Sequence, residues 1–171
     1  MDVLIVVDMQ EDFISGALGT PEAQAIVPAV TEKIRGFQGP VFATQDIHGE
    51  DYLLTQEGKN LPVPHCLKGS KGAQLCPEVQ ALLTTTPFEK SCFGSWELAE
   101  YMKQVHARSK IREIQLVGLC TDVCVISNAM LLKAALPEVK ITVDSACCAG
   151  VTPESHAVAL QAMAACQITV L

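Results

Sequence analysis

The sequence has few aromatic and few basic residues. Phe, Trp and Tyr together make up 5% of the 171 residues, and 12 Lys plus Arg stand against 19 Asp plus Glu. With a formal net charge of −7 there is no basic patch to neutralise phosphates, which argues against a nucleic-acid partner. No apolar run is long enough to span a membrane, so no membrane association is expected.

The sequence also lacks a C-x-x-C pair, although it contains 8 cysteines. Thioredoxin-type and zinc-ribbon proteins usually carry this pair, so its absence argues against both classes. The first residues carry Asp2 and Asp8 around a short apolar run and have no basic region, which differs from a signal peptide. We therefore expect a cytoplasmic protein whose thiols stay reduced and mostly pack as small buried hydrophobes.

Hydrophobic residues make up 49% of the chain and charged residues 18%, which excludes a disordered chain. Short apolar runs rich in β-branched residues alternate with segments that begin with helix caps. The predicted strands are Val3–Val7, Val41–Thr44, an end within Thr86–Glu89, Glu113–Leu119, Val139–Val143 and Gln167–Leu171. The predicted helix starts are Thr20, Ser95, Thr121 and Thr152. This alternation predicts one α/β domain over residues 1–171, a doubly wound, mostly parallel sheet of about six strands with helices on both faces.

Residues 45–75 show no periodicity and contain many Gly and Pro residues. A loop of this length inside a compact domain usually serves function. Ligands of open parallel sheets bind outside the carboxyl ends of the strands. Asp8, Asp46, Lys90 and the segment Cys120–Cys124 all follow predicted strands, so we expect them to converge on one edge of the sheet.

Cys124 is the candidate nucleophile. If Thr121 caps the following helix, Cys124 is the third helical residue and faces unpaired N–H groups, which favour a thiolate and an oxyanion. Asp8 follows an apolar strand, so partial desolvation raises its pKa and suits it to act as a general base. Lys90 follows the third strand, and its ammonium would stabilise the thiolate and hold Asp8 in place.

A second cluster lies in the long loop. Asp46 and His48 are two residues apart and so share one side of an extended chain, and His65 follows later. Two histidines and one carboxylate leave coordination positions open, as catalytic metal sites do, with Glu57 as a candidate fourth ligand. Zinc is the first candidate, and iron and manganese stay open.

These segments together resemble the isochorismatase-like cysteine hydrolases, and among them the nicotinamidases. The resemblance rests on Asp8-Met9-Gln10-Glu11-Asp12-Phe13, Thr44-Gln45-Asp46-Ile47-His48, Pro64-His65-Cys66-Leu67-Lys68-Gly69, Lys90 with Phe93, and Gly118 to Val125. Nearly the whole chain is covered.

The resemblance implies an Asp8–Lys90–Cys124 triad and a cis peptide before Cys120, with the N–H groups of Cys120 and Cys124 forming an oxyanion hole. It further implies that a metal on Asp46, His48 and His65 holds the pyridine nitrogen of nicotinamide, which is hydrolysed through a Cys124 thioester in NAD salvage. Phe13 and Phe93 would flank the ring. The resemblance also implies a homo-oligomer, a dimer or higher.

Two features depart from the nicotinamidase pattern. Leu61 precedes the Pro-x-Pro-His stretch where many nicotinamidases carry Trp, and the segment after Lys90 is short and poor in aromatics. A hydrolase of another small amide, an N-carbamoyl compound or a ureido compound is therefore the alternative. A thiol redox or metal-storage protein and a pure binding module are further hypotheses. Cys147 and Cys148 follow a strand toward the same edge, where they either line the pocket or pack.

Overall fold

A computed structural model describes all 171 residues. Six strands form one sheet in the order β3-β2-β1-β4-β5-β6, and every pairing is parallel. The strands are β1 (Asp2–Val7), β2 (Val41–Asp46), β3 (Phe88–Lys90), β4 (Glu113–Leu119), β5 (Lys140–Ala149) and β6 (Thr169–Val170). The predicted doubly wound α/β fold is confirmed, and β5 extends beyond the predicted strand.

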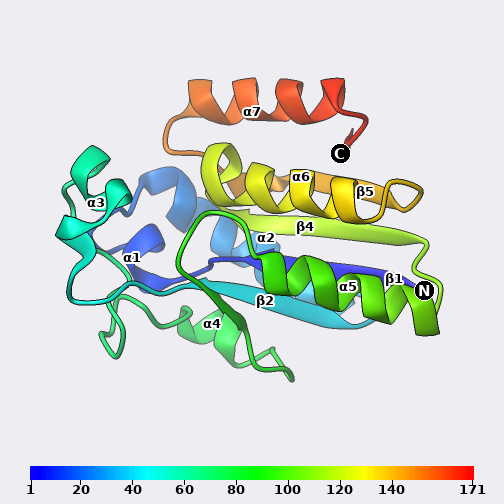
Figure 1. Cartoon of the computed structure of the whole chain (residues 1–171), viewed down its shortest axis with the longest axis horizontal. Helices are drawn as coiled ribbons and strands as arrows, with labels where there is room; N and C mark the ends of the chain where they lie inside the picture. Colours follow the sequence, from blue (N-terminus) through cyan, green and yellow to red (C-terminus); the bar gives the residue numbers. More distant parts are fainter.

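Helices cover both faces of the sheet, and each face has its own apolar core (Figure 1). One core lies under α5 (Trp96–Arg108), α6 (Ile126–Ala135) and α7 (Pro153–Ala165). The other lies under α1 (Glu11–Ile14), α2 (Pro21–Gly36) and α4 (Pro77–Gln80). None of the helices combines the length and apolar character that a bilayer crossing requires.

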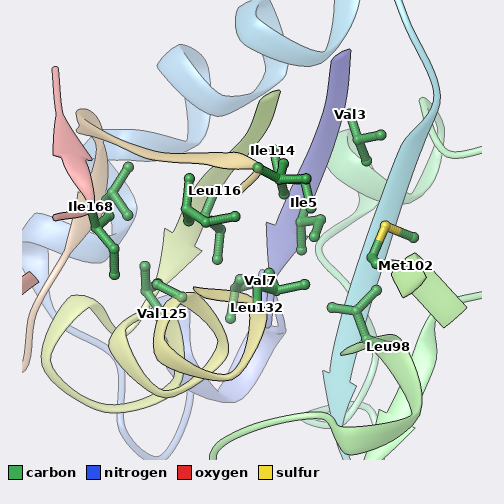
Figure 2. Packing of buried hydrophobic residues seen from close by; sticks show 14 of the residues in the cluster. Val3, Ile5, Val7, Leu98, Met102, Ile114, Leu116, Val125, Leu132 and Ile168 are labelled. Atoms are coloured by element: carbon green, nitrogen blue, oxygen red, sulfur yellow. The ribbon is translucent and has the colours of Figure 1, made fainter. Parts of the chain in front are cut away.

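After Asp2, strand β1 is apolar from Val3 to Val7 and buried on both faces, as parallel strands are. Val3, Ile5 and Val7 point into the first core, whereas Leu4 and Val6 point into the second. Figure 2 shows Ile5 and Val7 packed near Leu132, with Leu98 and Met102 of α5 on the neighbouring side. The strand therefore joins the two cores, and the residue that follows it is fixed in position.

The segment 45–75 lies at the carboxyl ends of the strands, opposite the N-terminus in Figure 1. It contains the 3₁₀ turn η1 (Tyr52–Leu54) and the short helix α3 (Gln56–Asn60), so it is less irregular than its sequence indicates. Isolated bridges join Gln10 to Leu75 and His48 to Leu67. The first bridge ties the segment to the turn after β1, and the second joins two parts of the segment itself.

The predicted caps at Thr20 and Thr152 are confirmed, and Ser95 caps the helix that was predicted to begin there. The Oγ atoms of Thr20, Ser95 and Thr152 accept backbone N–H groups at the starts of α2, α5 and α7. Thr121 does not cap a helix, because its hydroxyl is hydrogen bonded to Nδ1 of His156 at 2.8 Å. A π-helical turn, η2 (Thr121–Val125), comes first and α6 follows, so Cys124 is the fourth residue of that turn and not the third.

The order of the strands changes direction between β1 and β4, which are neighbours in the sheet. Open α/β sheets bind their ligands at such a switch point. Gly118 pairs with Val7 there and has φ +116. A Cβ at Gly118 would lie 2.1 Å from the Val7 carbonyl oxygen, so only glycine allows β4 to approach β1 closely.

We expect Gly118→Ala to lower the free energy of unfolding by at least ~1–3 kcal/mol, because Ala is strained at this φ and collides with Val7. Gly36→Ala is the matched control. Gly36 is the last residue of α2, and a Cβ added there has no atom within 4 Å. Denaturant unfolding of both variants measures the difference. Equal stability of the two variants would contradict the close approach at the switch point.

Candidate active site

Three predicted residues meet where β1, β3 and β4 end. The Lys90 Nζ lies 2.6 Å from Oδ2 of Asp8 and 3.6 Å from Sγ of Cys124. All three side chains are buried. The convergence predicted from strand ends is thus present, and a thiol, a carboxylate and an ammonium share one water-poor site.

Asp8 is held in an uncommon backbone conformation. Its φ is 46, a left-handed value that few non-glycine residues adopt, although Asp is among those that tolerate it. The Thr44 hydroxyl donates a hydrogen bond of 2.7 Å to Asp8 Oδ1, while Oδ2 contacts Lys90. Both carboxylate oxygens are therefore engaged, and the side chain has one orientation.

Burial decides the protonation of this cluster. Burial raises the pKa of Asp8, which is the predicted direction, although the positive charge of Lys90 acts to lower it. It also raises the pKa of Cys124 well above its usual range, with the Asp8 charge adding to the effect. This direction is opposite to the shift expected from the sequence, because burial of the thiol outweighs the positive charge of Lys90.

Lys90 remains charged. Burial alone would lower its pKa, but the carboxylates of Asp8 and Asp46 raise the pKa above its usual range. The site therefore keeps a positive charge beside Asp8 and Cys124.

The turn that carries Cys124 follows a cis peptide between Leu119 and Cys120, as the family resemblance implied. The Cys120 carbonyl accepts the N–H groups of Val123 and Val125 at 3.1 and 3.0 Å. That carbonyl does not engage the N–H of Cys124, which lies between them in the sequence. Burial raises the pKa of the Cys120 thiol to about 12, so this side chain stays neutral.

The four predicted metal ligands lie together next to the first cluster. One donor atom from each of Asp46, His48, Glu57 and His65 lies within 4.8 Å of the others. His48 Nε2 is 2.9 Å from Asp46 Oδ2, and Glu57 Oε1 is 3.6 Å from Nε2 of both histidines. Glu57, the candidate fourth ligand, therefore lies close enough to both histidines to share a metal ion with them.

The chemistry of these donors fits a divalent cation. His65 Nδ1 lies 2.8 Å from the Val63 carbonyl, and a proton donated there leaves Nε2 free as a ligand atom. Asp46 Oδ1 is buried and has no hydrogen-bond partner. Burial would raise the pKa of Asp46, but the neighbouring imidazoles of His48 and His65 and the charge of Lys90 hold it well below its usual range. The group thus offers a charged carboxylate whose Oδ2 faces two imidazoles.

An apolar cavity connects the two clusters. Asp46, Glu57 and His65 lie on its wall together with Cys120 and Cys124. The rest of the wall is mostly apolar and includes Phe13, Leu18, Thr20, Leu61, Phe93, Val123 and Val151. Both predicted ring-flanking residues therefore line the cavity, Phe13 from a buried position and Phe93 from a position that is 45% exposed. Leu61 contributes an aliphatic wall.

Several contacts of the site had no signal in the sequence. The Thr44 hydroxyl that binds Asp8 and the Tyr52 ring, 4.7 Å from the His48 ring and 5.0 Å from the His65 ring, are examples. A Thr at a strand end and a Tyr in a loop are too common to stand out. Cys147 and Cys148 are buried outside the cavity wall, so they pack and do not line it.

Comparisons with known proteins agree with this geometry. The chain is 28% identical to a nicotinamidase of Escherichia coli, with 97% of this chain and 92% of that protein covered. It is 26% identical to a nicotinamidase/pyrazinamidase of Mycobacterium tuberculosis, with 95% and 94% covered. A crystal structure of the pyrazinamidase of Pyrococcus horikoshii in complex with zinc has a TM-score of 0.80 at 28% identity, covering 99% of this chain and 98% of that one.

The family described as Isochorismatase domain matches residues 2–171, which is nearly the whole chain. The sheet order, the residues at the strand ends and this match agree with one another. The chain belongs to the isochorismatase family.

Proposed function

We propose that this protein is a nicotinamidase, which hydrolyses nicotinamide to nicotinic acid and ammonia. The observation that carries the proposal is the cavity that joins the Asp8–Lys90–Cys124 cluster to the donors Asp46, His48, Glu57 and His65. The relatives named for this activity support it over most of the chain.

Cys124 is the proposed nucleophile and Asp8 the base. Because burial raises the pKa of the thiol, its proton must leave as sulfur attacks the amide carbon. Asp8 accepts this proton, and its raised pKa suits a group that must hold and then release a proton. Lys90, within 3.6 Å of both partners, stabilises the negative charge as it moves between oxygen and sulfur.

The amide oxygen becomes negatively charged in this step, and backbone N–H groups of Cys120 and Cys124 are proposed to bind it. The C–N bond then breaks, and Asp8 gives its proton to the departing nitrogen, which leaves as ammonia. A water molecule attacks the thioester, with Asp8 removing its proton. The C–S bond breaks, which frees nicotinic acid, and the proton returns to Cys124.

The donors Asp46, His48 and His65, with Glu57 as the fourth, are proposed to hold a divalent metal. Zinc fits two imidazoles and carboxylates, and the related pyrazinamidase structure contains zinc, while iron and manganese use similar ligands. When bound, the metal would supply a Lewis-acid site for the pyridine nitrogen. Phe13 and Phe93 would then flank the ring, with its carboxamide near Cys124.

We expect Cys124→Ala to lower ammonia release from nicotinamide by about 10⁴-fold or more, because it removes the nucleophile. Cys120→Ala is the matched control in the same cavity, since Cys120 is proposed to act only through its backbone N–H. It should keep activity within about tenfold of the wild type, which corresponds to a change of at most about 1.4 kcal/mol in the activation free energy. Steady-state assays of both variants, with circular dichroism to confirm folding, measure the effect. Full activity in folded Cys124→Ala would refute the mechanism.

We expect removal of the metal by a chelator to lower nicotinamide turnover by at least about tenfold, with recovery on addition of zinc. His65→Ala should lose bound zinc, measured by elemental analysis, whereas His106→Ala, on α5 away from the cluster, should retain it. A protein that turns over nicotinamide equally well without metal would contradict the metal site. Turnover of N-carbamoyl or ureido compounds in preference to nicotinamide would instead favour the alternative substrate class.

A further inference from the structure

Two polar side chains that follow β1 make contacts that the proposed mechanism does not use: Gln10 in the turn before α1 and Asp12 within α1. Gln10 is completely buried, and its carboxamide makes three hydrogen bonds. Its Oε1 accepts the backbone N–H of Asp46 at 2.7 Å, and its Nε2 donates to the Asp46 carbonyl at 2.7 Å and to the Ala73 carbonyl at 2.8 Å. One side chain thus binds both polar groups of a single backbone residue.

This pairing replaces a missing strand. The register of β1 with β2 ends at Val6 and Ala43, so no backbone of β1 lies beside Asp46. On its other side Asp46 is paired with Lys90 of β3. The Gln10 carboxamide therefore supplies the partner that β1 does not, and it fixes the peptide from which the Asp46 carboxylate extends.

Asp12 makes an analogous contact two residues further on. Its Oδ2 accepts the backbone N–H of Cys66 at 2.7 Å, directly after His65, and Oδ1 accepts the N–H of Ala17 at 3.3 Å. Cys66 is buried and has φ 47, so this backbone is held in a left-handed conformation. A Cβ on Gly72 would meet the Asp12 carboxylate at 2.1 Å, which shows how closely the loop surrounds it.

We propose that Gln10 and Asp12 are positioning residues, which hold the backbones of Asp46 and His65 so that both side chains meet one metal ion. The inference rests on the metal site proposed above. Catalytic and binding groups must be held to within about 0.5 Å, and loss of an outer contact of this kind typically weakens metal binding by about 10–100-fold. Because Asp8 lies in the same turn, these contacts also fix the metal ligands relative to the base.

The chain offers a control that separates positioning from general loop stability. Gln45 Nε2 donates to the same Ala73 carbonyl as Gln10, at 2.6 Å, but makes no hydrogen bond to the Asp46 backbone. Gln45→Met therefore removes a contact to the loop, while Gln10→Met removes that contact and the Asp46 pairing together. Both substitutions keep side-chain volume roughly constant.

The test measures zinc affinity of the full-length protein by competition with a chelating indicator, and the absorption spectrum of the cobalt-substituted protein, which reports ligand geometry. We expect Gln10→Met to bind zinc about 10–100-fold more weakly than the wild type and to show a shifted cobalt spectrum. Gln45→Met should match the wild type in both measurements. Temperatures well below unfolding of the metal-free proteins are used, so that lower stability alone does not change the result.

Asp12→Asn provides a second variant if Gln10→Met fails to fold. It keeps the shape of the side chain, but only one of the two N–H groups of Cys66 and Ala17 retains an acceptor, so a severalfold loss of zinc affinity is expected. Wild-type affinity and spectrum in the folded variants would overturn the inference. A wild-type protein that binds no zinc would instead overturn the metal site itself, and with it the role of these residues.

Discussion

The ammonium group of Lys90 lies among three groups that carry or develop negative charge. Its Nζ is 2.6 Å from Asp8 Oδ2 and 3.6 Å from both Asp46 Oδ1 and Cys124 Sγ. Moving ions from water into a protein interior costs several kcal/mol per ion, and close pairing must offset this. The site therefore depends on all of these partners being present at once, which explains why they occupy the ends of adjacent strands.

Lys90 also connects the two halves of the site. Asp46 faces Lys90 with Oδ1 and the histidines with Oδ2, so one carboxylate belongs to both clusters. The apolar cavity between them is lined by residues of both clusters. In the proposed reaction, substrate binding and bond cleavage would be divided between two groups of residues that share the Asp46 carboxylate.

The sequence was sufficient to predict the strands and the residues at their ends. Apolar runs such as Val3–Val7 mark strands buried on both faces, and parallel strands bring Asp8, Lys90 and Cys124 to one edge whatever the detailed packing. Asp46, His48 and His65 stood out as candidate metal ligands because two imidazoles and one carboxylate leave coordination positions open, as catalytic metal sites do.

What the sequence did not reveal depends on contacts between distant segments. The pKa of Cys124 was expected to fall, but desolvation is set by everything packed around the thiol and is not visible in the local motif. Thr121 has the sequence of a cap, yet its hydroxyl is taken by His156 from α7. The same holds for Gln10, whose partners Asp46 and Ala73 lie far along the chain.

The pairing of β1 with β4 has a kinetic consequence. Asp2 lies opposite Glu113 and Val7 opposite Gly118, so the central ladder joins residues separated by most of the chain. Contacts so distant in sequence slow folding, because the chain loses the entropy of closing a long loop before these contacts can form. A nascent chain can pair its first strand with β2, but the other edge of that strand stays open until β4 has been synthesised. Asp8 and Lys90 meet Cys124 only after β4 is in place, so a fragment that ends before β4 lacks the complete candidate site.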